Sequence, residues 1–213
     1  MERNYYSINY ETSDEITGKD YPQADCLNID EIGKFSSWEL NKNEKILKFK
    51  LNNKSKLTDV ISVLEINTGF LISPKVKAIF DDFNLMRHQY FEASVETKSG
   101  VSKYYWLHLS EPNLSKLIDY KKSTFYETEF TFKKEQINID SFEHYQKLKS
   151  KDKEASFGVK LEQICFSNKF DNTLDLFAFL PFNNEVFISE KLKKELVKNE
   201  IFSFKISDAD VFI

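Results

Sequence analysis

Histidine and cysteine are the residues of this sequence that most readily do chemistry. The three histidines, His88, His108 and His144, stand in no HxH or HExxH spacing, so the sequence predicts no metal site. The two cysteines, Cys26 and Cys165, form no CxxC motif and are expected to be reduced thiols. Neither residue type therefore indicates a metal centre or a redox pair.

Serine nucleophiles and paired acids give no stronger signal. A nucleophilic serine needs a sharp turn and a nearby base, and the sequence contains no GxSxG motif. Ser73 and Ser189 are the most tempting serines, but each precedes an amphipathic segment, where capping a helix explains a serine fully. Paired acids such as Asp81–Asp82 at a helix end are usually solvated. The sequence predicts no catalytic residue, no cofactor and no enzyme activity.

Composition is typical of an ordinary globular protein. The 213 residues are 41% hydrophobic and 30% charged, with a net charge of −4. A negative charge argues against a nucleic-acid partner, and the lysine-rich stretch 147–153 has only Tyr145 nearby for stacking. A transmembrane helix needs about eighteen consecutive apolar residues, and no stretch of the sequence approaches that length. The first ten residues, MERNYYSINY, contain no apolar core of a signal peptide. We therefore expect a cytoplasmic protein that binds neither nucleic acid nor membrane.

A phrase that occurs twice organises the expected fold. LISPKVKAIF begins at Leu71 and FISEKLKKEL begins at Phe187. In both, an apolar strand leads to a serine, Ser73 or Ser189, whose hydroxyl can cap the helix that follows. An aromatic strand comes after each helix. The sequence thus predicts two strand–Ser-capped helix–strand units as a pseudo-repeat, the alternative being that two such caps arose independently.

Alternating polar and apolar residues predict the remaining elements. We expect an α+β fold with a mixed, mainly antiparallel sheet and about three helices. An acidic strand-and-loop segment, 1–55, precedes an α+β region, 56–213, and is expected to form one compact unit with it. Further strands are expected near 4–10, 46–51, 101–109, 125–132, 157–166 and 175–180, and a further helix near 141–151.

Acidic residues gather near the start of the sequence. Residues 1–31 contain eight acidic residues and two basic ones. Such a segment can face a basic partner, although most charge runs are simply solvated surface. The carboxylates that we predict to contact a partner are those of Glu11, Asp14, Glu15 and Asp20.

Three segments in order show a family resemblance: GFLISPKVKAIF, then KYYWLHLSEPNLSKLIDYKKSTF, then DLFAFLPFNNEVFISEKLKKEL followed by FSFKI. Together, over about residues 56–206, they resemble a family of bacterial immunity proteins from polymorphic toxin systems, formerly a domain of unknown function. The family often has a glycine after the second helix and a proline after the last aromatic strand, where this chain has Asn199 and Ile206. The matching positions are Ser73, Tyr104, Tyr105, Ile118, Asp119, Ser123, Leu176, Phe177, Ser189, Glu190, Lys191, Leu192 and Lys193.

The resemblance implies a cytoplasmic protein that protects its producer, or the producer's kin, by binding a cognate toxin. Such inhibition needs a complementary surface, on the order of 1,600 Å² in a standard interface, rather than catalytic groups. The matching positions look structural, so they identify neither the toxin-binding surface nor an oligomeric state. Two alternatives stay open: a non-catalytic adaptor or other interaction module, and a hydrolase with an unrecognised site.

Overall fold

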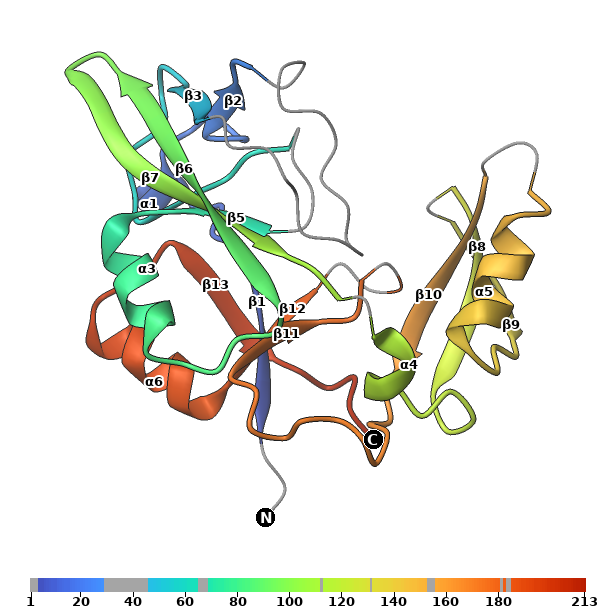
Figure 1. Ribbon diagram of the computed structural model, residues 1–213. Helices are drawn as coiled ribbons and strands as arrows, with labels where there is room; N and C mark the ends of the chain where they lie inside the picture. Colours follow the sequence, from blue (N-terminus) through green and yellow to red (C-terminus); the bar gives the residue numbers. More distant parts are fainter. Residues whose placement is uncertain are drawn as a thin grey trace.

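The computed structural model shows an α+β protein, as predicted (Figure 1). Its described helices comprise three of eight or nine residues, α3 (Pro74–Asp81), α5 (Phe142–Lys149) and α6 (Glu190–Lys198), and the single turns α1 (Asp14–Thr17) and α4 (Leu114–Leu117). The structure describes residues 4–28, 46–64, 69–111, 113–130, 132–152, 156–180, 182 and 185–213.

A mixed six-stranded sheet has the order β2–β3–β6–β7–β5–β4. Strand β3 runs parallel to β6, and every other pair of neighbours is antiparallel. The strands are β2 (Ala24–Cys26), β3 (Leu47–Leu51), β4 (Val60–Ile61), β5 (Gly69–Ile72), β6 (His88–Thr97) and β7 (Gly100–Leu109).

Two smaller sheets are antiparallel throughout. One has the order β11–β12–β1–β13, and the other has the order β10–β8–β9. The smaller of the two lies with α5 at one side of the molecule, away from α3 and α6 (Figure 1). The strands are β1 (Tyr5–Tyr10), β8 (Thr124–Glu129), β9 (Phe132–Ile137), β10 (Phe157–Gln163), β11 (Leu176–Ala178), β12 (Val186–Ser189) and β13 (Phe204–Asp208).

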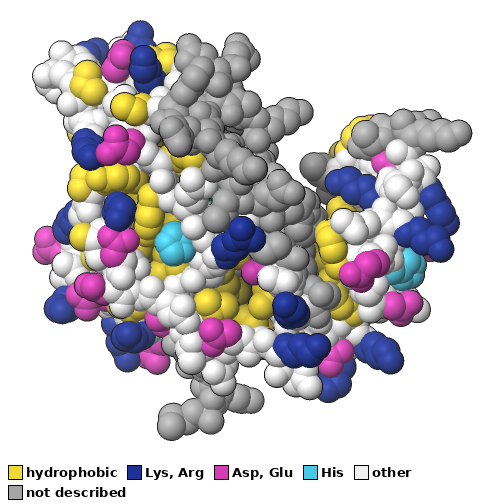
Figure 2. All heavy atoms as spheres, viewed as in Figure 1, with side chains coloured by type: hydrophobic (Ala, Val, Ile, Leu, Met, Phe, Trp, Pro, Cys, Tyr) yellow, Lys and Arg dark blue, Asp and Glu magenta, His cyan; other side chains and the backbone are white. Residues whose placement is uncertain are grey.

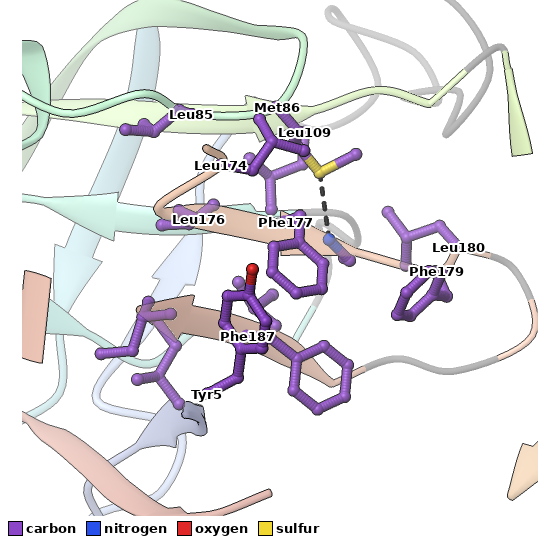
Figure 3. Close-up of a cluster of buried hydrophobic side chains, with 14 of the residues drawn as sticks. Tyr5, Leu85, Met86, Leu109, Leu174, Leu176, Phe177, Phe179, Leu180 and Phe187 are labelled. Carbon is purple, nitrogen blue, oxygen red and sulfur yellow. Dashed lines mark hydrogen bonds between the residues drawn. The ribbon is translucent and has the colours of Figure 1, made fainter. Parts of the chain in front are cut away.

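Aromatic side chains fill most of the core. In the larger hydrophobic cluster, Phe177, Phe179 and Phe187 are fully buried, and the ring of Tyr5 meets that of Phe177 edge to face at 4.9 Å (Figure 3). A second cluster around Trp106 covers the opposite face of the six-stranded sheet. Neighbouring residues of a strand point to opposite faces, so this sheet is buried on both sides.

The two repeated phrases have the same local structure. Ser73 Oγ accepts a hydrogen bond from Val76 N at 3.3 Å, and Ser189 Oγ accepts one from Leu192 N at 3.2 Å. Both serines therefore cap their helices, α3 and α6. Each satisfies an amide that has no partner within the first helical turn.

Each capping serine also binds an aspartate fourteen residues earlier. Ser73 Oγ donates to Asp59 Oδ1, and Ser189 Oγ donates to Asp175 Oδ1, both at 2.6 Å. The backbone is paired in the same way, since the amide of each serine donates to the carbonyl of its aspartate at 2.8 and 2.9 Å. The repeat thus includes the strand before each phrase, β4 or β11.

The equivalence extends to the sheets, where β4–β5–β7–β6 matches β11–β12–β1–β13. The register agrees at both sides of the central strand. Ile72 lies opposite Tyr105 as Ile188 lies opposite Tyr6, and β6 begins opposite Leu109 as β13 begins opposite Tyr10. We call β4, β5, α3, β6 and β7 the first unit, and β11, β12, α6, β13 and β1 the second unit. The central strand of the first unit, β7, comes after the other elements of that unit in the sequence. The central strand of the second unit, β1, comes before the others, so the two units are related by a circular permutation.

Contacts between the units are reciprocal. The Lys75 ammonium donates to the Asn199 carbonyl at the end of α6 at 2.6 Å. Lys191, the equivalent residue of α6, lies 4.6 Å from the centre of the Phe83 ring, just after α3. Because each helix sends the same lysine to the end of the other, an approximate two-fold rotation relates the units.

The second unit has an addition that the described part of the first unit lacks. Ile164, just after β10, forms a parallel bridge to Phe212, just after β13. This bridge is equivalent to the parallel pairing of β3 with β6 in the first unit. Strands β8 and β10 therefore correspond to β2 and β3. Between β8 and β10 the chain forms β9 and α5, which we call the insert. Residues 29–45, which separate β2 from β3, lie outside the described residues.

Candidate protein-binding surface

The four predicted partner-binding carboxylates lie on and beside α1, with two different local roles. Glu11 Oε1 accepts hydrogen bonds from the next two backbone amides at 2.8 and 2.9 Å, and Asp20 Oδ2 accepts one from Lys54 N at 2.9 Å. Asp14 and Glu15 are exposed in the first turn of the helix. Glu11 and Asp20 thus hold the backbone, whereas Asp14 and Glu15 present their charge to solvent.

A polar hollow lies close to this acidic segment. Its volume is about 610 Å³, and Thr12 and Tyr21 of the segment contribute to its wall. Three carboxylates and one ammonium group also line it, those of Glu185, Asp208, Asp210 and Lys205. No pattern in the sequence predicted that residues from the beginning and the end of the chain would line one acidic surface. That arrangement follows from the pairing of β1 with β13.

The structure does not bring the histidines and cysteines together. His108 is buried within β7, His88 Nδ1 lies 2.8 Å from the Met86 carbonyl, and His144 Nδ1 lies 3.4 Å from Asp140 Oδ2 near α5. Among the described residues, no group of three histidine, cysteine or acidic side chains is placed to hold a metal ion.

The two serine–aspartate pairs are part of the scaffold. Each serine hydroxyl donates to a carboxylate and accepts from the amide of a helix, as described above. Ser73 and Ser189 are both buried, and the arrangement occurs in both units. A hydroxyl used in this way stabilises the helix entry rather than attacking a substrate.

The tip of the β8–β9 hairpin displays two aromatic rings. Phe130 and Phe132 are 70% and 72% exposed, more than any other large hydrophobic side chain in the described ranges. Phe130 has a φ of 54°, a left-handed conformation that costs a bulky residue roughly 1 kcal/mol. Its amide donates to the Ser156 carbonyl at 2.7 Å, which ties the tip to the segment before β10. Strain of this kind is often found at functional sites.

Beside the hairpin lies a hollow between the sheet and α5. It has a volume of about 680 Å³ and includes the apolar side chains of Leu148 and Phe157. Four carboxylates and two ammonium groups line it, those of Glu127, Glu129, Glu135, Asp152, Lys134 and Lys151. The surplus of acidic groups gives this hollow a net negative charge. Over the whole face of the molecule drawn in Figure 2, acidic and basic side chains are mixed.

Local contacts fix some of these charges. Lys134 Nζ lies 2.5 Å from Glu129 Oε2, and this hydrogen bond raises the pKa of the ammonium group. Asp152 Oδ2 accepts a hydrogen bond from Phe157 N at 2.8 Å. Glu127 and Glu135 form no ion pair with any residue that the structure describes. The charge of Glu127 also raises the pKa of the Lys134 ammonium group, so this carboxylate is partly compensated by the insert.

The sequence predicted neither the hairpin tip nor the hollow. FYETEFTF alternates regularly, and it predicted one strand over 125–132. The chain instead turns at Phe130 and returns as β9. A turn that uses phenylalanine rather than glycine or asparagine has no local sequence signal.

No protein-family model and no curated protein matches this chain. The resemblance to immunity proteins therefore stays a prediction from the motifs. In the part of the chain that the structure describes, no helix is both long and apolar enough to cross a membrane.

Proposed function

We propose that this protein is an immunity protein that binds and neutralises a cognate bacterial toxin in the cytoplasm of the producing cell or its kin. The main support is the pair of exposed rings, Phe130 and Phe132, on a hairpin tip. A few buried aromatic anchors usually supply most of the affinity of a protein interface. A strained, solvent-exposed phenylalanine does not help the isolated fold, so binding is the better explanation for it.

The motif residues support this proposal in a different way, because they build the scaffold that holds the insert. Ser123 Oγ accepts a hydrogen bond from Cys165 N at 2.9 Å, and Asp119 N donates to the Cys165 carbonyl at 2.8 Å. Tyr104 Oη donates to the Thr58 carbonyl at 2.6 Å. A scaffold that holds an exposed insert in this way is suited to a protein that recognises a partner through the insert.

A rescue assay tests the proposal. The protein domain encoded next to this gene, which the proposal expects to be toxic, is expressed in a sensitive host, with and without this protein. We expect co-expression to restore growth and the two proteins to co-purify. A neighbour that kills regardless of co-expression, or that is harmless, contradicts the immunity function. The hairpin surface would then indicate an adaptor or interaction module.

The rings of the hairpin tip provide a sharper test. Phe130→Ser with Phe132→Ser should weaken the complex on the order of 100-fold, because two anchors are lost. Val101→Ser is the matched control, since Val101 is 68% exposed near the tip of the β6–β7 hairpin. Titration calorimetry measures both affinities, and circular dichroism checks the fold. An unchanged affinity of the double variant rules out the tip as an anchor.

The acidic segment is expected to affect the association rate rather than the final affinity. Reversing Glu11, Asp14, Glu15 and Asp20 to lysine would remove charge that attracts a basic toxin. Asp14→Lys with Glu15→Lys is the cleaner variant, because these two carboxylates hold no backbone amide. We expect association to slow several-fold at low salt in stopped-flow measurements and the difference to vanish at high salt. Equal association rates of the variant and the wild-type protein at low salt would contradict a role of the acidic segment in binding.

A further inference from the structure

Strand β9 lies at the edge of its sheet. β9 is the last strand of its three-stranded sheet, and no described strand pairs with its far side. Five of its six residues, Phe132 to Gln136, are exposed. Unpaired amide and carbonyl groups on such an edge are ready to pair with another chain.

The two lysines of this edge strand pair within their own sheet. Lysines on an edge strand normally project into solvent and repel an incoming strand. Here Lys133 lies 3.6 Å from the centre of the Tyr126 ring on β8 and pairs with Glu162. Lys134 pairs with Glu129 on β8. Both ammonium groups are therefore held by ion pairs of their own sheet, although the lysine side chains stay 40% and 48% exposed.

The surroundings of β9 suggest what kind of segment would fit. Phe130 and Phe132 stand at one end of the strand, and the negative hollow lies between the strand and α5. Leu148 and Phe157 can contact the aliphatic stem of a long side chain. The carboxylates of Glu127 and Glu135, which form no ion pair within the described ranges, complement a positive head group.

We propose that the partner adds an extended segment to the open edge of β9. The segment places a lysine or arginine side chain in the hollow beside α5 and apolar side chains against Phe130 and Phe132. Backbone pairing supplies affinity in this mode of recognition, and the side-chain positions supply specificity. The identification of the partner as a toxin rests on the proposed function, whereas the chemistry of the segment rests on β9 and its surroundings.

The purified complex with the toxin domain provides the first test. Amides of β9 should exchange with deuterium at least tenfold more slowly in the complex than in the free protein. Glu127→Gln with Glu135→Gln should weaken binding about tenfold, which corresponds to a loss of about 1.4 kcal/mol of binding free energy. The control is Glu96→Gln, on the exposed side of β6. A complex that forms without protecting β9 and tolerates both substitutions overturns strand addition while leaving the immunity function intact.

A second test does not need the toxin. A phage-displayed random peptide library is selected on the wild-type protein and counter-selected on a variant with Phe130→Ser, Phe132→Ser, Glu127→Lys and Glu135→Lys. We expect enriched peptides with alternating apolar residues and at least one lysine or arginine. Such peptides would support the strand-addition site even if the neighbouring toxin is not bound. Enrichment of acidic peptides, or equal enrichment on both proteins, overturns it.

Discussion

The first and second units share a helix entry but differ in their central strands. In both units an aspartate binds the serine that caps the helix. The central strand contains Trp106 in the first unit and Ser7 at the equivalent place in the second. The hydrogen bonds that start the helix have thus been kept in both units, whereas the side chains that fill the surrounding space have diverged.

The divergence gives the two sheets different faces. Trp106 and Phe91, paired across β7 and β6, belong to the second hydrophobic cluster. Ser7 and Ser207, paired at the equivalent place, line the polar hollow near the acidic segment. The first unit therefore buries this face at its β6–β7 pair, whereas the second unit buries it beside β11 and β12, where Phe177 and Phe187 lie, and lines a polar hollow at its β1–β13 pair.

Replacing Trp106 with the residue of the other unit should have the largest effect on stability. Trp106→Ser removes a fully buried indole and should lower the free energy of unfolding by about 4 kcal/mol. Urea denaturation followed by circular dichroism measures the change. Ser7→Ala is the control and should change stability by less than about 0.5 kcal/mol, since it removes only a half-buried hydroxyl. Equal losses in the two variants would contradict the difference between the faces.

The equivalent aspartates should differ by a smaller amount. Asp175 is 3% exposed and also accepts a hydrogen bond from Asn84 N at 3.2 Å, whereas Asp59 is half-buried. We expect Asp175→Ala to cost about 2–3 kcal/mol, because it leaves buried donors unpaired, and Asp59→Ala to cost about 1 kcal/mol. Differential scanning calorimetry of both variants tests the order. A greater loss from Asp59→Ala would show that burial does not decide the contribution of this motif.

Glu111, just after β7, corresponds to Thr12 after β1 and should give the smallest effect. Burial raises the pKa of Glu111, so its ionisation opposes folding, although an amide of Asn113 at 2.5 Å and the charges of Arg87 and Lys116 lower this cost. Glu111→Gln should stabilise the protein at pH 7 by less than about 1 kcal/mol.

The pH dependence of that gain shows whether the ionised Glu111 carboxylate destabilises or stabilises the folded state. Below the ordinary carboxyl pKa of 4.5 the glutamate is neutral in both the folded and unfolded states. The gain from Glu111→Gln should therefore shrink as the pH falls from 7 to 4, and urea titrations at both pH values measure it. A gain that is larger at pH 4 would mean that the carboxylate stabilises the folded state.

Much of the scaffold is written in short stretches of sequence. The capping serines are followed by apolar residues at helical spacing, so both helices begin where the sequence predicts. The partners of those serines, Asp59 and Asp175, lie fourteen residues earlier, across a strand pair. No local pattern links an aspartate to a serine at that distance, because the contact exists only once the strands have paired.

The sequence by itself determined the α+β class, the two Ser-capped helices and the repeat of the phrase that contains them. These features depend on hydrogen bonds and periodicities within a few residues of each other. Only the tertiary structure decided that β1 completes the second unit, that the chain turns at Phe130 and that no described strand pairs with the outer edge of β9. Strand pairing joins residues that are far apart in the chain, and its partners are fixed by packing over the whole core rather than by any one segment.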